Sequence, residues 1–97
     1  MNVAGHEFEG PYEIGKKVVD RAAVYVILDA QNHVIDVGQS GEAGTRLLNH
    51  DRKLCWDRHD GKRFVLKWMP TTSYSIEDRI ELETSIRLKY NPLCGKK

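Results

Sequence analysis

The chain has 97 residues, 40% of them hydrophobic, and its 15 Lys and Arg residues nearly balance its 14 Asp and Glu residues, for a net charge of +1. This length suits one domain with a modest core. The longest apolar run, AAVYVIL, is far too short to span a membrane, and two cysteines are too few for a disulfide framework. Because no signal-like segment opens the chain, we expect a cytoplasmic protein without membrane contacts, with free thiols at Cys55 and Cys94.

The first segment, residues 1–21, is interrupted by three glycines and one proline, so no long helix or strand is expected there. We predict an irregular arm packed on a single body formed by residues 22–97. The body begins with AAVYVILD, rich in β-branched and aromatic residues, and continues through AQNH into VIDVG, which predicts a β-hairpin. A hairpin loop of two or four residues would place Tyr25 and Asp36 on one face of the sheet.

The next segment, from Thr45 to about His59, has leucines at 47, 48 and 54 with charged residues between them, which predicts a helix. Residues 45–67 carry seven bases against three acids, whereas residues 1–44 carry three bases against seven acids. A local basic stretch on a nearly neutral protein favours contact with a polyanion such as nucleic acid. A solvated helix surface of mixed charge is the alternative interpretation.

The last part of the chain predicts one strand and one helix. The strand is RFVLKWMP, ended by Pro70, and the helix runs from about Ser75 to Tyr90. The element order β-β-α-β-α therefore predicts an α+β domain, in which helices flank a small three-stranded antiparallel sheet.

The spacing of several features resembles the GIY-YIG nucleases. These features are AVY at 23–25, then ten residues, then DVGQSG at 36–41, followed by Arg46, His50 and a helical Glu83 nine residues before Pro92. The resemblance covers residues 23–92, and the family fold, a three-stranded antiparallel sheet flanked by helices, has the element order predicted above. It implies an endonuclease, a hydrolase that cleaves DNA phosphodiester bonds with one Mg²⁺ or Mn²⁺.

The resemblance also implies roles for individual residues. Tyr25 is the tyrosine of the first motif. Arg46 would contact the scissile phosphate, and His50 would orient the attacking water or the leaving group. Glu83 would hold the divalent cation. The loop after the second motif would consist of Gly38, Gln39, Ser40 and Gly41.

Asp36 stands where the second motif of the family has a tyrosine, and it is a candidate to accept a proton from water or to bind the cation. The alternative is an aspartate that pairs with a nearby Lys or Arg. The residues of the basic stretch that we expect to contact nucleic acid are Arg52, Lys53 and Lys62.

Other interpretations remain open. Glu83 has Arg79 and Arg87 four residues to either side, so an ordinary charge ladder along the helix also explains it. A zinc site near Cys55 is disfavoured, because on one helix only Cys55 and His59 would face each other.

The main functional alternative is a nucleic-acid-binding or protein-interaction module on the same scaffold without catalysis. A small regulatory protein unrelated to nucleic acid is a third reading. DNA, including structured or branched DNA, is the expected partner. A homodimer or a partner protein would be needed for sequence specificity.

Overall fold

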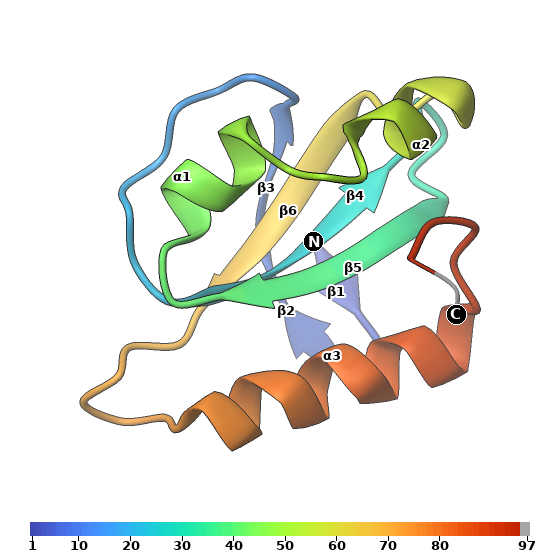
Figure 1. Ribbon diagram of the computed structural model, residues 1–97. Coiled ribbons are helices and arrows are strands. Elements are labelled where there is room, and N and C mark those ends of the chain that lie inside the picture. Colours follow the sequence, from blue (N-terminus) through green and yellow to red (C-terminus); the bar gives the residue numbers. More distant parts are fainter. Residues whose placement is uncertain (96–97) are drawn as a thin grey trace.

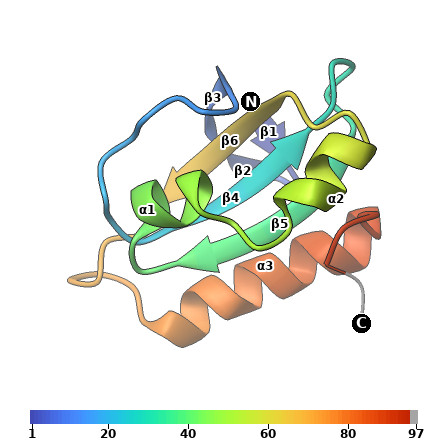
Figure 2. The ribbon, with the colours of Figure 1, turned by 45° about the horizontal axis from the view of Figure 1, so that its top comes forward.

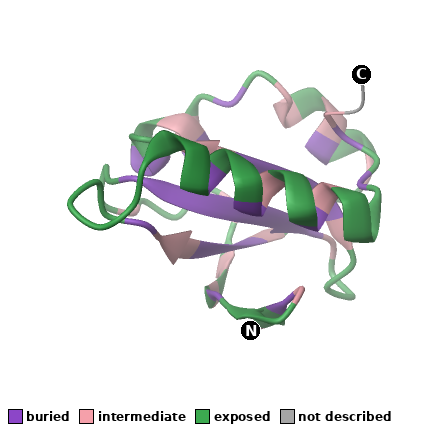
Figure 3. Cartoon of the chain, turned by 90° about the horizontal axis from the view of Figure 1, so that it is seen from below, coloured by how far each residue is buried: buried purple, intermediate pink, exposed green. Residues whose placement is uncertain are grey.

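The computed structural model describes residues 1–95, which form a four-stranded antiparallel sheet covered on both faces (Figure 1). The strands follow the order β3 (Glu9–Glu13), β6 (Arg63–Trp68), β4 (Ala23–Leu28) and β5 (Val34–Ser40). One face carries α1 (Ala43–Leu48) and α2 (Lys53–Arg58). The other carries α3 (Ile76–Tyr90) and a separate two-stranded sheet of β1 (Asn2–Val3) and β2 (His6–Glu7) (Figures 1 to 3).

The central strand β4 explains why the sequence AVYVIL is apolar throughout rather than alternating. All six of its residues are buried, since helices cover both faces of the sheet. Val24, Val26 and Leu28 pack in the core with residues of α3, whereas Tyr25 and Ile27 pack in the core under α1 and α2. The side-chain alternation of this strand thus divides the molecule into two cores.

The predicted three-stranded sheet with order β-β-α-β-α is wrong, first because the N-terminal arm is not irregular. It forms β1, β2 and β3, and β3 pairs with β6 as a fourth strand of the main sheet. The three glycines lie at positive φ where the chain turns or the pairing is irregular: Gly5 between β1 and β2, Gly10 within β3, and Gly15 just after β3. Pro11 is tolerated because β3 is an edge strand.

The prediction is also wrong for the first helix, which is two short helices separated at residues 49–52. Side chains satisfy the last carbonyls of α1: Asn49 Nδ2 donates to Thr45 O, and Lys53 Nζ donates to Leu48 O. The periodic pattern was misleading at Leu54, which is 78% exposed, whereas Trp56 enters the core. The break turns His50 toward the sheet instead of leaving it on a helix surface.

Helix α3 begins and ends within one residue of the predicted range. Ser75 and Asp78 form a reciprocal capping box, and Asn91 in the left-handed conformation ends the helix. Its outward side is exposed, and its inward side buries Arg79, Leu82 and Ile86 (Figure 3). No helix within residues 1–95 is long and apolar enough to cross a membrane.

The two cysteines are not free thiols, so that prediction is wrong. Cys55 on α2 and Cys94 after α3 form a disulfide with a Cα–Cα distance of 5.9 Å. They are 39 residues apart in sequence, and only the three-dimensional packing brings them together. The bond joins the C-terminal segment to α2.

Candidate active site

The pairing of β4 with β5 positions the first group of predicted site residues. Tyr25 lies opposite Gly38, and Ile27 lies opposite Asp36, so these side chains face α1 and α2. A Cβ at residue 38 would fall on the ring and hydroxyl of Tyr25, so only glycine fits beneath this tyrosine. Gly38 therefore makes room for Tyr25.

Tyr25 and His50 form a buried polar pair. The Tyr25 hydroxyl lies 2.6 Å from His50 Nε2, and the two rings meet edge to face at 5.6 Å between centroids. The other side of the His50 ring packs on Trp56 at 4.5 Å. Tyr25 and His50 are at most 5% exposed, so this pair is held rigidly beneath the α1–α2 connection.

The pKa of His50 gives its charge, and its hydrogen bonds give its tautomer. Burial lowers the pKa of His50 to about 4, and the charges of Arg52 and Arg46 act in the same direction, so the ring is neutral at pH 7. Its Nδ1 accepts from the backbone N–H of Arg52 at 3.1 Å, which places the single ring proton on Nε2. Asp51 Oδ1 also lies 3.2 Å from Nδ1, but its side chain is 69% exposed and free to turn away, so the backbone contact decides the tautomer.

In this tautomer Nε2–H donates to the Tyr25 oxygen, and the phenolic O–H of Tyr25 stays available as a donor. Burial raises the pKa of Tyr25 to about 12, although the charges of Arg46 and Arg52 oppose the shift. The phenol is therefore protonated at neutral pH. The phenol thus keeps one O–H that can act as a hydrogen-bond donor.

Arg46 lies at the exposed side of this pair. Its charge acts on both Tyr25 and His50, while its Nη2 donates to Asp51 Oδ1 at 2.9 Å. The Arg46 side chain is 38% exposed and that of Asp51 is 69% exposed, so this ion pair contributes little stability and opens easily. The carboxylate of Asp51 occupies the place on Arg46 that a phosphate oxygen would take.

Asp36 is completely buried and joins β5 to two helices. Its Oδ1 accepts from Val37 N and from Arg87 Nη2, both at 2.8 Å. Its Oδ2 accepts from Arg52 Nε and from Trp56 Nε1, both at 2.7 Å. Burial would raise the pKa of Asp36, but the hydrogen bonds from Arg52, Trp56 and Arg87 prevail and hold it below its usual value. With four donors in place, the geometry suits a structural anchor better than a base or a metal ligand.

Glu83 on α3 faces a groove of about 440 Å³ beside this anchor. Its Oε2 lies 3.6 Å from Arg87 Nε, which is beyond hydrogen-bond distance. Burial raises the pKa of Glu83, although Arg87 and Arg52 oppose the shift. Glu83 is the only acid among the described residues that line the groove: Arg52, Ile80, Glu83, Thr84, Arg87, Asn91, Pro92 and Gly95.

The remaining predicted residues have more local roles. Gly38, Gln39 and Ser40 belong to β5 rather than to a loop, and only Gly41 lies in the turn before α1. Gln39 Oε1 accepts from Arg79 Nε at 3.0 Å, and Ser40 Oγ accepts from Glu42 N at 2.9 Å. These residues shape the chain reversal between β5 and α1.

The three residues predicted to contact nucleic acid differ in their availability. Arg52 is held by the buried Asp36, and Lys53 caps the end of α1. Lys62 pairs with Asp60 at 3.2 Å, and both of their side chains are about 60% exposed. Lys62 is thus the most accessible of the three.

Sequence reasoning missed Arg87 and Trp56 as partners of Asp36, and it missed Cys94 as a partner of Cys55. The sequence contained one signal for such partners: an aspartate within an apolar strand is buried only if cationic or polar groups donate hydrogen bonds to it. Nothing in the spacing shows that Arg87, 51 residues away, supplies one of them.

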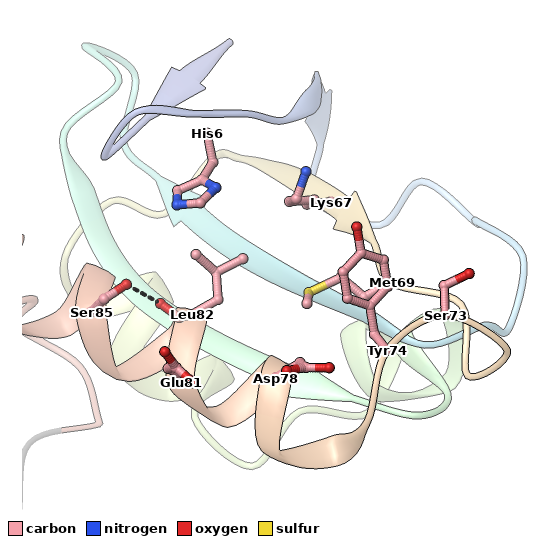
Figure 4. Close-up of a pocket in the computed structure, with 9 residues that line it drawn as sticks. All are labelled: His6, Lys67, Met69, Ser73, Tyr74, Asp78, Glu81, Leu82 and Ser85. Carbon is pink, nitrogen blue, oxygen red and sulfur yellow. Dashed lines mark hydrogen bonds between the residues drawn. The ribbon is translucent and has the colours of Figure 1, made fainter.

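A second hollow lies on the opposite face of the sheet and contains no predicted site residue (Figure 4). It measures about 520 Å³ and is open between the N-terminal hairpin and α3. Its lining mixes apolar residues with both signs of charge: His6, Lys67, Met69, Ser73, Tyr74, Asp78, Glu81, Leu82 and Ser85.

Comparison of the chain with family models, curated proteins and solved structures gives no match. The relation to the GIY-YIG nucleases therefore stays a prediction, which is based on the spacing of Tyr25, Gly38, Arg46, His50 and Glu83.

Proposed function

We propose that this chain hydrolyses phosphodiester bonds of DNA as a GIY-YIG-type endonuclease, with the reaction taking place beside Tyr25, His50 and Arg46. The observation that carries the proposal is the 2.6 Å contact between Tyr25 and His50 Nε2, with the half-buried Arg46 close enough for its charge to act on both. An aligned phenol, a neutral imidazole and a guanidinium suit the binding and polarisation of a phosphate.

The protein residues have separate tasks in this proposal. Arg46 leaves Asp51 and binds the scissile phosphate, whose developing charge it offsets. Tyr25 donates its O–H to a phosphate oxygen or to the attacking water. His50, fixed by the Arg52 backbone N–H, keeps the Tyr25 hydroxyl in that orientation. Asp36 has no direct part and instead holds Arg52 and Arg87 against β5.

Glu83 fits a divalent cation that arrives together with the substrate. Arg87 already has better acceptors in Asp36 and in Cys94 O, so Glu83 turns away from it at little cost. Mg²⁺ and Mn²⁺ accept one protein carboxylate when water and phosphate complete the shell, and Thr84 and Asn91 add oxygen atoms to the same groove. When bound, such a cation would stabilise the negative charge of the leaving oxygen.

The proposed substrate is DNA, including branched or otherwise structured DNA. A homodimer or a partner protein would supply the sequence specificity. The sequence also predicts a cytoplasmic location. The Cys55–Cys94 disulfide argues against that location, because disulfides rarely persist in reducing compartments.

A catalytically inactive nucleic-acid-binding or protein-interaction module is the second candidate. Asp36 favours it, because an anchored carboxylate stands where the family has a tyrosine that contacts the reacting groups. In that case the Arg46 site would bind phosphate without cleaving it.

The decisive experiment is a cleavage assay on plasmid and branched DNA with Mg²⁺ or Mn²⁺. Glu83→Gln should abolish cleavage, because the carboxylate is the proposed metal ligand. The matched control is Glu81→Gln, an exposed acid that lines the hollow on the opposite face and should keep full activity. Absence of cleavage by the folded native chain, together with salt-dependent DNA binding, would favour the second candidate.

A further inference from the structure

We propose that Cys55, His59 and Cys94 form a zinc site when the disulfide is reduced. In the oxidised structure the two disulfide sulfur atoms and a ring nitrogen of His59 all lie within 4.8 Å of one another. This inference does not depend on the proposed nuclease activity.

The first two ligands are fixed by α2. Cys55 lies on the helix, and His59, four residues later, ends it, with its backbone N–H donating to Cys55 O at 3.1 Å. Residues at this spacing project from the same side of a helix, which is how paired ligands commonly meet a zinc ion. Within residues 1–95 the His59 ring makes no hydrogen bond, so a disulfide alone gives no reason for its position.

The third ligand is positioned by contacts that do not involve its sulfur. Cys94 N donates to Ile35 O at 2.9 Å, and Cys94 O accepts from Arg87 Nη1 at 3.0 Å. The backbone of Cys94 is thus tied to β5 and α3 whether or not the disulfide exists. Reduction frees each sulfur to rotate about its Cα–Cβ bond while the two backbones stay in place.

The chemistry of the donors selects the metal. Two thiolates and one imidazole form a soft set that favours Zn²⁺ in tetrahedral geometry and does not suit Mg²⁺. A water molecule would take the fourth position. Cys55 and His59 are partly exposed and Cys94 is buried, so an ion can enter from the α2 side.

The disulfide is converted to a zinc site in two steps, reduction and metal binding. A reductant breaks the S–S bond and gives two cysteine thiols. A dithiol does so by exchange and ends as its cyclic disulfide, and a phosphine ends as its phosphine oxide with the oxygen taken from water. Zn²⁺ then replaces the two thiol protons, which are released to solvent, and the neutral His59 nitrogen completes the protein ligands.

The structural consequence concerns the C-terminal segment. In an oxidising compartment the disulfide holds residues 91–95 to α2, and in a reducing compartment zinc would hold them there instead. The same segment contributes Asn91, Pro92 and Gly95 to the groove that contains Glu83. A zinc cross-link would therefore allow the groove to form where a disulfide does not persist.

Metal content after reduction tests this inference. The native chain, reduced with a phosphine and then dialysed against Zn²⁺ without oxygen, should bind one Zn²⁺ per chain, and the oxidised chain should bind none. Co²⁺ should give the thiolate-to-cobalt charge-transfer absorption only with the reduced chain. Zn²⁺ should also raise the melting temperature of the reduced chain and leave that of the oxidised chain unchanged.

Single variants distinguish the loss of a zinc ligand from the loss of the disulfide. His59→Ala keeps both cysteines and should lower zinc affinity by more than the roughly 10-fold to 100-fold loss typical of a missing supporting group. His33→Ala, an exposed histidine paired with Asp29, is the matched control and should bind like the native chain. Cys94→Ser should bind no zinc under the same reducing conditions, in which the native chain also lacks its cross-link.

The inference is overturned if the folded, reduced chain binds no zinc or if the oxidised chain binds it equally well. It is also overturned if His59→Ala matches the native affinity. Zinc bound by a reduced chain that stays unfolded would count against it too, because a built site requires the native fold.

Discussion

Asp36 shows how the role of a residue changes once its neighbours are known. From the sequence it is a degenerate active-site position, where tyrosine would restore the family pattern. In the structure its carboxylate satisfies two guanidinium groups and an indole N–H inside the core. A tyrosine there would displace these partners and leave Arg52 and Arg87 without their carboxylate, which typically costs about 3 to 5 kcal/mol. The substitution is therefore a folding defect and does not test catalysis.

The buried His50 makes the stability of the protein depend on pH. Its pKa of about 4 in the folded state lies below the ordinary value of 6.5, so the unfolded chain binds the proton more readily. This contribution to stability is fully present above pH 6.5 and is lost as the pH falls toward 4. We expect the free energy of unfolding to drop by roughly 3 kcal/mol across that range, measured by urea titration.

His50→Gln isolates this effect, because glutamine does not titrate. The variant should be less stable than the native chain at pH 7 but should lose much less stability between pH 6.5 and 4. The exposed His33→Gln variant should retain the native slope. An unchanged slope in His50→Gln would show that other groups cause the pH dependence.

At the scale of elements, the sequence predicts those parts whose signals are local. The strand β4 and the helix α3 follow from an apolar run and from a capping box with a helix-ending Asn-Pro, and both lie close to their predicted ranges. Strand β3 was missed because its pairing with β6, 50 to 57 residues away, decides its conformation, and β1 and β2 were missed because each has only two residues. The break between α1 and α2 was missed because it depends on His50 and Arg52 reaching partners on β4 and β5.

The same division applies to the site. Tyr25 and Asp36 face the same side as predicted, but not through the expected loop of two or four residues. The loop spans residues 29–33, and the irregular pairing between Ile27 and Leu28 restores the expected register. The pairing of Arg87 with Asp36 and of Cys94 with Cys55 depends on how α3 lies against the sheet. No spacing within one element encodes that arrangement.

The pairing of β4 with β5 depends on the absence of a side chain at Gly38. Gly38→Ala should lower the free energy of unfolding by about 1 to 3 kcal/mol, because a methyl group would overlap the Tyr25 ring. Gly41→Ala is the control: the nearest atom to its added Cβ is the end of the Arg79 side chain at 3.8 Å, so its stability should be nearly native. Equal thermal stability of the two variants would contradict the close packing of Tyr25 on Gly38.

At the scale of the whole molecule, charge is distributed unevenly along a nearly neutral chain. Residues 45–67 carry seven of the 15 Lys and Arg residues of the chain, but the structure removes several of these bases from consideration as DNA contacts. Arg52 neutralises Asp36, Lys53 caps α1, and Arg63 donates to Ala30 O and Asn32. Arg58 is exposed at the end of α2, Lys67 lines the hollow on the opposite face, and Arg46 and Lys62 remain accessible in weak ion pairs.

Arg46 and Lys62 should each contribute to the salt dependence of DNA binding. In the absence of divalent metal, affinity should fall steeply as salt increases, and Arg46→Gln and Lys62→Gln should each reduce the slope of log affinity against log salt by about one. Asp51→Asn should raise affinity, because it removes the carboxylate that competes with phosphate for Arg46.

Lys16→Gln serves as the control, since Lys16 follows β3 at the edge of the sheet opposite β5 and stacks on Tyr12. Fluorescence anisotropy with a short duplex measures all four variants. If affinity is independent of salt, or if Lys16→Gln changes the slope as much as Arg46→Gln does, the α1–α2 face is not a phosphate-binding surface and both proposed nucleic-acid functions fail together.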